Sequence, residues 1–429
     1  MQTINVAILG MGTVGQGVAM MLLEQGDFLE KQAGCKIVLK RILEKYYEKD
    51  LDFDSRDIPI SDRWQDILDD TDIHIVVEVL GGVEPAKTFI SEALRQGKHV
   101  VTANKDLLAL HGQELFTIAK ESGVDLYFEA SVGGVIPVLC SLRQNLLADP
   151  LKEVMGIVNG TTNYILTRMA GEGGDFSTIL EEAQKLGYAE ANPASDVEGL
   201  DAGRKAALLS TLAFHSQVTL NDVHIEGITG ITSEDMHFAD QMGYTIKLLA
   251  ICKEIGGRIE ARVNPSLLPK NHPLSAVKDT FNAIFVRGDN IGDVMLYGRG
   301  AGRFPTASAI LGDVLEIVKN IRFGSCGRLT RVYDREKAII PMEEVETRFF
   351  IRLLLTDKSG VLAAVTKTLS TYDVSLKSII QTDIADGEAK LVFVTHLVRE
   401  GNMRKALEEL RSLEDTKEVL TVLRVEGDT

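Results

Sequence analysis

The first 130 residues alternate two patterns of apolar positions. Short runs rich in β-branched residues predict strands, and the stretches between them repeat apolar residues every three or four positions, which predicts helices. The predicted strands are Ile4–Leu9, Ile37–Leu43, Ile73–Leu80, His99–Ala103 and Asp125–Phe128, and the predicted helices are Val14–Glu24, Trp64–Leu68, Pro85–Gln96 and Gly112–Ser122. Apolar strands that alternate with helices are typical of a parallel, doubly wound sheet, so we predict an α/β, Rossmann-type domain over residues 1–130.

The pattern of residues 131–330 is more mixed and predicts a second, α+β domain. The predicted helices are Pro137–Leu146, Asn163–Ala170, Ser177–Leu186, Gly199–Ala213, Asp240–Ile255 and Thr306–Lys319, and the predicted strands are Leu151–Ile157, Arg258–Leu267, Asn282–Val286 and Asp293–Gly298. A glycine loop, 298–305, leads into the last helix. We expect this helix, over residues 305–320, to pack back on the first domain.

The final part of the chain begins with a charged stretch, 331–346, which we interpret as a solvated linker. The elements predicted beyond it are Arg348–Leu355, Val361–Ser370, Val374–Asp383, Ala389–Val398, Met403–Leu413 and Val419–Val425. Their order is β-α-β-β-α-β, so we predict a ferredoxin-like domain over residues 347–429.

Composition narrows the class of protein. The 429 residues carry 46 Lys and Arg against 62 Asp and Glu, for a net charge of −16. Such an acidic surface repels phosphate backbones and anionic lipid, so we expect no nucleic-acid and no membrane partner. No apolar run reaches the ~18–20 residues of a membrane span, and no basic, apolar signal segment opens the chain. We therefore expect a cytoplasmic enzyme.

The four cysteines are scattered, with no CxxC pair and no grouping with histidine; they are Cys35, Cys140, Cys252 and Cys326. We interpret them as small apolar residues in the interior of a reduced protein.

The glycines Gly10, Gly12 and Gly15 form a GxGxxG motif between the first predicted strand and helix. Gly10 permits a tight turn, Gly12 lets the backbone approach a pyrophosphate, and Gly15 lets helix and strand pack closely. Because the motif stands in the strand–turn–helix context, we favour dinucleotide binding over a structural glycine turn.

The position that commonly contacts the cofactor ribose falls near Glu44 and Lys45, after Lys40 and Arg41. A carboxylate there binds the 2′-hydroxyl of NAD, whereas a cation binds the 2′-phosphate of NADP. The chain offers both, and a solvated run of charges explains them equally well, so both cofactors stay open.

Lys105 follows the predicted strand His99–Ala103, at the edge of the sheet where open parallel sheets bind ligands. A lysine there would bring a positive charge to the nicotinamide or the substrate. The alternative is a surface lysine whose stem lies along apolar neighbours.

Asp201 and Lys205 are four residues apart and so share a face of one predicted helix. An exposed helical ion pair would explain the spacing. However, the helix continues as a nearly continuous apolar run, which predicts burial. Together with Glu190 and Asp196, the pair suggests a polar pocket for a cationic amino group.

Four sequence blocks resemble those of homoserine dehydrogenases when they are read with the glycine motif. They are Thr102-Ala-Asn-Lys105, Glu129-Ala-Ser-Val-Gly-Gly-Val-Ile-Pro137, Asn159-Gly-Thr-Thr-Asn-Tyr-Ile165 and 187–205. The resemblance covers residues 1–320. The stretch Asp357-Lys-Ser-Gly360-Val-Leu362 is similar to an ACT domain, a small amino-acid-binding module. Because no aspartate-kinase segment precedes residue 1, we expect the monofunctional bacterial form.

The resemblance implies the reversible reduction of L-aspartate 4-semialdehyde to L-homoserine by NAD(P)H, on the route to threonine, isoleucine and methionine. It makes Lys205 the proton donor and puts Lys105 at the junction of cofactor and substrate. By the same resemblance Glu190 and Asp201 hold the substrate, and Asp196 orders their pocket.

For the cofactor, NADP or NAD, the resemblance implies contacts with Gly10, Gly12, Thr13, Val14, Gly15, Lys105, Gly187, Glu190 and Gly302. The family also binds a monovalent cation, usually sodium, through backbone oxygens that correspond to Glu129, Val132, Gly134 and Ile136. A glycine-rich turn of carbonyls suits such a hard cation.

Two rival functions differ in class. A phosphorylating aspartate-semialdehyde dehydrogenase needs a cysteine nucleophile with a histidine base, and only Cys140 lies near the predicted domain junction. An amino-acid sensor would combine an inactive dehydrogenase fold with the ACT module. The presence of Asp201, Lys205 and Glu190 favours an active enzyme.

Threonine, the end product of the pathway, is the effector that we expect at the ACT domain, where Asp357 would face its ammonium group and Gly360 would open a backbone anion site. A dimerisation module without a ligand is the alternative. The family resemblance also suggests a homo-oligomer, a dimer or a tetramer, joined through the middle domain.

Overall fold

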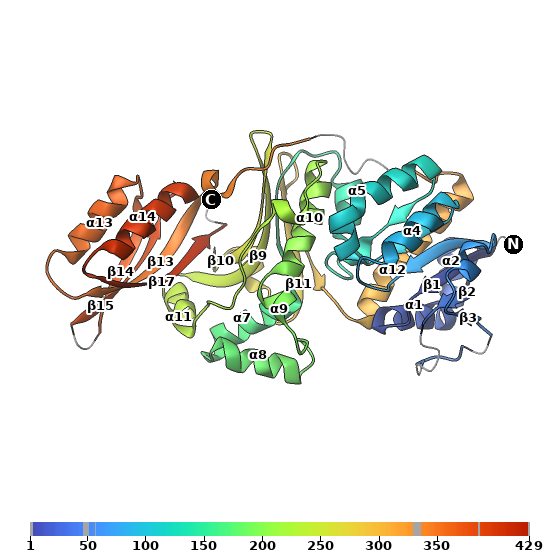
Figure 1. Ribbon diagram of the computed structural model, residues 1–429, viewed down its shortest axis with the longest axis horizontal. Helices are drawn as coiled ribbons and strands as arrows, with labels where there is room; N and C mark the ends of the chain where they lie inside the picture. Colours follow the sequence, from blue (N-terminus) through green and yellow to red (C-terminus); the bar gives the residue numbers. More distant parts are fainter. Residues whose placement is uncertain (1–2, 46–50, 56, 329–335, 385–386, 428–429) are drawn as a thin grey trace. The chain divides into compact units, whose positions relative to one another are not determined.

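The computed structural model describes residues 3–45, 51–55, 57–328, 336–384 and 387–427. The chain divides into two compact units, which Figure 1 draws as ribbons. Unit 1 comprises residues 1–154, 204–223 and 282–337, and unit 2 comprises residues 155–203, 224–281 and 338–429. Each unit is therefore assembled from three separate stretches of the chain.

Unit 1 contains a six-stranded parallel sheet with the strand order β3-β2-β1-β4-β5-β6. The strands are β1 (Thr3–Leu9), β2 (Lys36–Leu43), β3 (Ile60–Ser61), β4 (Ile73–Glu78), β5 (His99–Thr102) and β6 (Leu126–Tyr127). This order is that of the doubly wound dinucleotide-binding fold. The prediction of an α/β fold with a Rossmann-type sheet is confirmed.

The helices of unit 1 are α1 (Thr13–Glu24), α2 (Gly26–Ala33), α3 (Gln65–Leu68), α4 (Ala86–Arg95), α5 (Lys105–Ser122), α6 (Val138–Cys140), the part of α10 (Leu200–Phe214) that begins at Arg204, and α12 (Arg303–Phe323). Short 3-10 or π turns cover Glu129–Ser131, Ser141–Asn145 and Leu220–Asp222. Helix α5 begins well before the predicted Gly112, because the side chain of Asn104 caps it by accepting the N–H of Leu107 (3.1 Å). Helix α2 was not predicted; it buries only Leu29 and Ala33, which is too weak a pattern.

The core of unit 1 joins the sheet to the last helix, α12. Buried residues of α12 pack in one cluster with those of β1, β2 and α1; on α12 they are Ala307, Ile310, Leu311, Val314, Ile317 and Val318. Gly17 of α1 lies so close to α12 that a Cβ on this glycine would stand 2.8 Å from the side chain of Arg303, the first residue of α12. A helix from the distant end of the unit thus covers the sheet.

Unit 2 contains a mixed sheet whose strands follow the order β9-β10-β17-β13-β15-β14. They are β9 (Tyr244–Ile255), β10 (Arg258–Pro269), β17 (Thr416–Val425), β13 (Glu346–Thr356), β15 (Glu388–Thr395) and β14 (Leu376–Ile384), with β8 (His224–Ile225) beside β10 and β16 (Val398–Arg399) beside β13. The remaining strands of the chain are β7 (Leu151–Ile157), β11 (Phe281–Gly288) and its neighbour β12 (Gly292–Arg299).

The helices of unit 2 are α7 (Gly160–Glu172), α8 (Phe176–Lys185), α9 (Ala194–Val197), α11 (Ser233–Gln241), α13 (Val361–Thr371) and α14 (Glu400–Ser412), with 3-10 turns at Pro273–Ala276 and Met342–Glu344. The elements β13-α13-β14-β15-α14-β17 reproduce the predicted ferredoxin-like order and share one apolar core.

One predicted helix, Asp240–Ile255, is wrong. The structure has the strand β9 over Tyr244–Ile255, preceded by α11, and Gly243 (φ +84°) separates the two. The residues from Ile246 to Cys252 are all buried. Apart from Lys247 these residues are apolar, and such a run fits a strand covered on both faces as well as a buried helix, which periodicity cannot distinguish.

The predicted linker is only partly free. Its residues 331–335 lie outside the described part of the chain. Farther on, Ile259 of β10 donates its N–H to Ala338 (2.9 Å) and accepts that of Ile340 (2.7 Å). The second half of the linker is therefore bonded to the sheet of unit 2.

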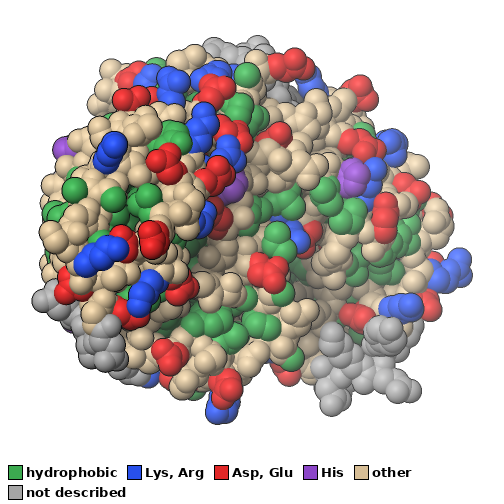
Figure 2. All heavy atoms as spheres, turned by 60° about the vertical axis from the view of Figure 1, so that its left-hand side comes forward, with side chains coloured by type: hydrophobic (Ala, Val, Ile, Leu, Met, Phe, Trp, Pro, Cys, Tyr) green, Lys and Arg blue, Asp and Glu red, His purple; other side chains and the backbone are tan. Residues whose placement is uncertain are grey.

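Surface charges of both signs are interspersed on the face that Figure 2 shows. Within the described residues, no helix is long and apolar enough to cross a membrane.

Candidate active site

The glycine motif forms the turn between β1 and α1 in unit 1. Gly10 has φ +97°, and a Cβ there would stand 2.9 Å from the carbonyl oxygen of Val79. A Cβ on Gly15 would stand 1.9 Å from the carbonyl oxygen of Gly10, whereas a Cβ on Gly12 would meet nothing within 4 Å. Two glycines thus permit close packing and the third leaves space beside the N-terminus of α1, where Thr13 is exposed and Val14 half-buried. A pyrophosphate fits this arrangement.

Glu44 lies at the end of β2 and faces this turn, because its carboxylate accepts the N–H of Met11 (2.8 Å). Lys40 is engaged elsewhere and forms ion pairs with Asp70 (2.8 Å) and Asp72 (3.0 Å). Of the charged residues predicted near the cofactor ribose, Glu44 thus contacts the glycine turn, whereas Lys40 contacts Asp70 and Asp72.

Lys105 is the first residue of α5, just beyond the end of β5, and is half-buried. The preceding residues fix its position: Asn104 caps the helix and donates to the carbonyl oxygen of Gly82 (2.6 Å). Thr102 donates to Glu78 (2.6 Å), a fully buried carboxyl whose pKa burial raises. The backbone of Lys105 therefore lies at the edge of the sheet where this fold binds its ligands.

Lys205 lies half-buried on α10, in the part of the helix that belongs to unit 1. Its neighbour Arg204 forms an ion pair with Asp106, which follows Lys105 on α5 (2.7 Å). One ion pair thus joins the helix positions next to the two predicted lysines.

In unit 2, Asn159 brings two of the predicted carboxylates together. Its side-chain nitrogen donates to Asp196 (2.7 Å) and to Asp201 (2.9 Å), and its side-chain oxygen accepts the N–H of Thr162 at the start of α7 (2.9 Å). Asp201 and Asn159 are buried. A cluster with two carboxylates and one amide suits a cationic amino group.

Gly187 and Glu190 lie in the loop after α8, also in unit 2. Both are exposed, and Gly187 has φ +76°. The backbone oxygen of Glu190 accepts from the side chain of Gln184 (3.0 Å). This contact fixes the backbone of Glu190, whereas the hydrogen bonds that join Asp196 and Asp201 come from Asn159.

The predicted cation turn follows β6 in unit 1. Glu129 is buried, and its carboxylate accepts the N–H groups of Leu139 (2.8 Å) and Cys140 (2.6 Å). Gly134 has φ +58°, and a Cβ there would stand 2.6 Å from the carbonyl of Gly300. The turn through Val132, Gly134 and Ile136 is therefore closed on itself and packed against the glycine loop before α12.

That glycine loop ends at Gly302, the residue before α12, with φ +123°. A Cβ on Gly300 would stand 2.0 Å from the side chain of Asn282, so the loop has no space for a side chain there. Arg303 forms an ion pair with Asp52 (2.6 Å). In unit 1, Gly302 thus begins the helix that packs on α1.

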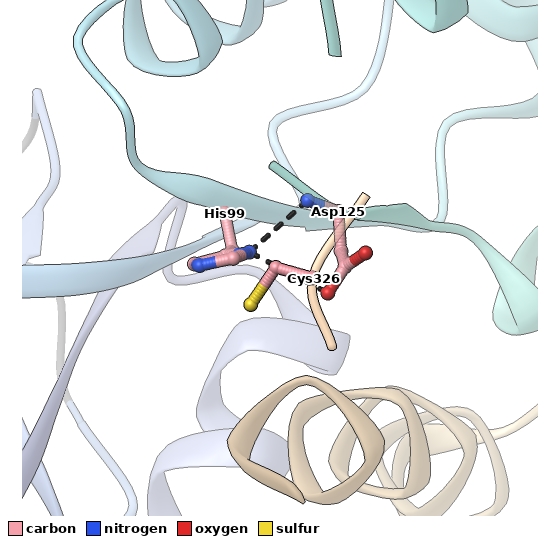
Figure 3. A group of neighbouring side chains, drawn as sticks. All are labelled: His99, Asp125 and Cys326. Carbon is pink, nitrogen blue, oxygen red and sulfur yellow. Dashed lines mark hydrogen bonds and ion pairs between the residues drawn. The ribbon is translucent and has the colours of Figure 1, made fainter. Parts of the chain in front are cut away.

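A further polar cluster, His99, Asp125 and Cys326, lies in unit 1 (Figure 3). Here the fold corrects the expectation that no cysteine groups with a histidine. His99 Nδ1 accepts the N–H of Asp125 (3.0 Å), while the Asp125 carboxylate accepts from Gly327 (2.7 Å) and Asn320 (3.1 Å). These bonds connect β5 and the residue before β6 to the end of α12, and we assign the cluster a structural role.

The cysteines themselves are all free thiols. Cys35 and Cys252 are buried, as predicted, and Cys140 and Cys326 are partly buried. Burial raises the pKa of the Cys140 thiol, and the nearby Glu129 raises it further. A nucleophilic cysteine needs the opposite shift, so the site does not support a phosphorylating dehydrogenase.

Sequence reasoning assigned no role to Asn159, Glu78 or Asn104. Asn159 opens one of the four sequence blocks that resemble homoserine dehydrogenases, and its Asn-Gly-Thr-Thr context signals a helix cap. No local pattern signals that the same side chain reaches Asp196 and Asp201, which lie far along the chain.

Three family models match successive parts of the chain. Residues 10–129 match the model described as homoserine dehydrogenase, NAD binding domain, residues 137–315 match that of homoserine dehydrogenase, and residues 349–415 match the ACT domain.

Known proteins match over the full length. The chain is 44% identical to a homoserine dehydrogenase of Bacillus subtilis, over 100% of this chain and 99% of the relative, and 42% identical to one of Synechocystis, over 99% of each. The crystal structure of a homoserine dehydrogenase from Thiobacillus denitrificans superposes with a TM-score of 0.93 at 35% identity, covering 99% of this chain and 98% of the other.

A hyperthermophilic archaeal homoserine dehydrogenase in complex with NADPH is similar over 74% of this chain and 98% of its own, with a TM-score of 0.61 and 27% identity. The resemblance read from the sequence is thereby confirmed. This chain belongs to the homoserine dehydrogenase family, oxidoreductases that use a nicotinamide cofactor to act on a CH–OH group.

Proposed function

We propose that the chain catalyses the reversible reduction of L-aspartate 4-semialdehyde to L-homoserine, on the route to threonine, isoleucine and methionine. The observation that carries the proposal is the cluster of Asn159, Asp196 and Asp201, in which Asn159 and Asp201 are buried and Asp196 is half-buried. Lys205 follows Asp201 by one helical turn on α10. The carboxylates suit the amino group of a substrate, and the lysine four residues after Asp201 in the sequence of the helix suits a reacting oxygen.

The carboxylates bind and orient the substrate. Asp201 accepts its ammonium group, Asp196 is held beside Asp201 by Asn159, and Glu190 completes the site from the loop after α8. Fixing the amino group limits the positions that the aldehyde carbon can take, which supplies much of the rate enhancement in reactions of this kind.

Lys205 donates the proton. The aldehyde oxygen becomes negative as its carbon is reduced, and an ammonium group stabilises that charge before it transfers a proton. General-acid catalysis of this kind contributes roughly 10²–10⁴-fold. Lys105 adds a second positive charge at the sheet edge and lies between cofactor and substrate.

The glycine motif would hold the cofactor. The space beside Gly12 and the N-terminus of α1 fit a pyrophosphate, and Glu44 lies next to the same turn. We propose further contacts with Thr13, Val14, Gly187, Glu190 and Gly302. When bound, a reduced nicotinamide supplies the hydride.

A spectrophotometric assay tests the proposal. The full chain should oxidise NADH or NADPH only when L-aspartate 4-semialdehyde is added, and should reduce NAD⁺ or NADP⁺ with L-homoserine. Rates with the two cofactors give the preference. An exposed-lysine variant, Lys319→Ala, is the matched control for Lys205→Ala. Turnover that requires inorganic phosphate, or none at all, would overturn the proposal.

A monovalent cation such as sodium is the second proposed ligand, held by backbone oxygens of Glu129, Val132, Gly134 and Ile136. The glycine conformations close this turn, and carbonyl donors suit a hard ion. Activity should fall when sodium is replaced by choline at constant ionic strength and return when sodium is added. Equal activity in both salts would contradict the site.

Threonine is the effector that we propose for the ACT domain. Gly360 has φ +97° and precedes α13, which leaves backbone N–H groups near Asp357 for a carboxylate and an ammonium group. Millimolar threonine should inhibit the full chain, and Asp357→Asn should weaken the inhibition without changing activity in its absence. Inhibition that is equal in both proteins, or absent, would favour a module that only pairs subunits.

We further propose that the enzyme is a cytoplasmic homo-oligomer, a dimer or a tetramer. Four free thiols suit a reducing compartment. Light scattering coupled to size exclusion gives the mass of the particle, and a monomer would contradict the assembly.

A further inference from the structure

Arg424 of β17, a buried residue, connects two partly buried carboxylates in unit 2. Its guanidinium donates to Glu226 at 2.7 and 3.0 Å, and to Glu400 at 2.8 and 2.9 Å. Arg424 is 6% exposed. Glu400 begins α14 of the ACT domain, whereas Glu226 follows β8, outside that domain. Bidentate contacts on both sides fix the position of each carboxylate, which lysine could not do.

The state of Glu226 agrees with this geometry. Burial favours its neutral form, but hydrogen bonds from His224 and Arg424 outweigh burial and lower its pKa to about 2. Glu226 is therefore ionised at neutral pH, and the pair with Arg424 is a pair of full charges.

The segment that follows Glu226 lies against α9. Ile228 donates its N–H to the carbonyl of Val197 (2.8 Å). A Cβ on Gly227 would stand 2.3 Å from that carbonyl oxygen and 2.6 Å from the Cα of Glu198. Only a glycine allows this approach, so a shift of residues 226–228 must also move residues 197–198.

Residues 197–199 link the two acids of the proposed substrate site. Asp196 directly precedes them, and Asp201 lies two residues beyond Gly199. Gly199 has φ +84°, and a Cβ there would stand 3.2 Å from the carbonyl oxygen of Glu226. The backbone of Glu226 thus packs closely against the backbone that connects Asp196 to Asp201.

We propose that Arg424 is a positioning residue: through Glu226 it holds the segment 197–199, and so sets the separation of Asp196 and Asp201 from within the C-terminal module. The inference rests on the proposed function, because it takes these two acids as the substrate site. It also gives the ACT domain a physical route to the site, since Glu400 of α14 shares the same guanidinium.

The fold does not depend on Arg424 alone. Strand β17 remains attached to β10 through the backbone pairing at Ser266 and Leu267, and through a buried network. In that network Arg262 pairs with Glu260 (2.8 Å) and Glu426, and Lys253 pairs with Glu426 (2.8 Å). Variants at Arg424 should therefore keep the strand order.

Steady-state kinetics of Arg424→Gln, Arg424→Lys and Glu226→Gln test the proposal in the full chain. We expect the KM for L-aspartate 4-semialdehyde to rise about fivefold or more, with kcat changed much less and the KM for the cofactor unchanged. Arg424→Lys should recover only part of the loss. The control is Arg404→Gln on α14, whose partner Glu343 is exposed. A uniform loss of kcat, or no change in substrate KM, would overturn the proposal.

Hydrogen exchange supplies a readout that needs no activity. The amides of residues 197–199 and 228 should exchange faster in Arg424→Gln than in the wild type and in Arg404→Gln, whereas those of β10 should not. Unchanged exchange at these amides would overturn the proposal.

Asp201→Asn distinguishes a failure of the positioning role of Arg424 from a failure of the proposed substrate site. If it raises substrate KM and Arg424→Gln does not, the site stands and the positioning role fails. If faster exchange in Arg424→Gln comes with an unchanged KM in Asp201→Asn, the contact route stands and the substrate site is wrong, which also removes the catalytic part of this inference.

Discussion

The ammonium group of Lys247 lies 2.8 Å from the side-chain oxygen of Asn163, on the helix that Asn159 caps. Lys247 is 2% exposed and also donates to the carbonyl of Val277. The Asn163 amide in turn donates to the carbonyls of Asp279 (2.9 Å) and Phe281 (3.1 Å). A buried lysine thus connects β9, α7 and the loop before β11.

Stability should depend on pH through this lysine. Burial lowers the pKa of Lys247 to about 8 from the ordinary 10.5 of a lysine. Between these values the unfolded chain binds the extra proton, so Lys247 makes the free energy of unfolding rise with pH from about 8 to about 10.5. Below pH 8 the buried charge lowers stability by a constant amount.

Urea unfolding at several pH values from 7 to 10 checks this. The stability difference between wild type and Lys247→Met should shift in favour of the wild type as pH rises above about 8. Lys319→Met, at an exposed position of α12, should show no such trend. A difference that stays flat across the range would remove Lys247 as the cause.

Lys205→Ala should lower kcat by at least about 10², because the proton donor is lost. Cofactor affinity, measured by fluorescence titration with NADPH and NADH, should stay near normal, since the glycine motif is untouched. If the variant keeps more than about a tenth of wild-type kcat, another group donates the proton.

Asn159→Ala should raise the KM for homoserine strongly and lower stability. The substitution removes a donor that Asp196 and Asp201 share, and so leaves two like charges close together with less compensation. Asp201→Ala should also raise this KM, by loss of the ligand itself. An unchanged KM in either variant would place the amino-group site elsewhere.

The glycines of the motif should fail in different ways. Gly12→Val should fold, because a Cβ there meets nothing within 4 Å, but it should not bind cofactor. Gly15→Ala should lower the melting temperature, because its Cβ would lie 1.9 Å from the Gly10 oxygen. Thermal unfolding and cofactor titration of both variants separate the outcomes; normal binding by folded Gly12→Val would contradict the cofactor site.

Removal of residues 341–429 should destabilise the rest of unit 2. Among the described residues, the fully buried Arg262 pairs with the carboxylates of Glu260 and Glu426, and the truncation removes the second. Loss of one partner from a buried pair costs about 3–5 kcal/mol. The truncated chain should be insoluble or melt at a clearly lower temperature. An unchanged melting temperature would show that the network contributes little.

Much of the fold could be predicted from the sequence, because strands such as Ile4–Leu9 and the glycine motif carry strong local signals. One element predicted wrongly is β9, whose apolar residues from Leu248 to Cys252 are consecutive, so this part of its pattern has no period that would distinguish a strand from a helix. It forms a strand because it pairs with β10 along its whole length, from Tyr244 opposite Pro269 to Ile255 opposite Arg258. This pairing is a tertiary contact, which the local pattern does not encode.

The candidate site divides in the same way. Helical spacing alone predicted that Asp201 and Lys205 share one helix, which is α10, and the pattern predicted that Lys105 closely follows a strand, which is β5. Other contacts join residues that are distant in the chain. They are the hydrogen bonds of Asn159 with Asp196 and Asp201, the ion pair of Arg204 with Asp106, and the ion pair of Arg424 with Glu226. No periodicity encodes such contacts, so only the folded structure shows them.

Helix α12 has a consequence for how the protein is made. Its side chains fill the core beside β1, yet they leave the ribosome long after β6 has been synthesised. Until then the nascent dinucleotide-binding domain carries an uncovered apolar face, which favours binding by chaperones and aggregation. A gene fragment that stops at residue 130 would encode such a state permanently, so a soluble cofactor-binding fragment must carry α12 as well.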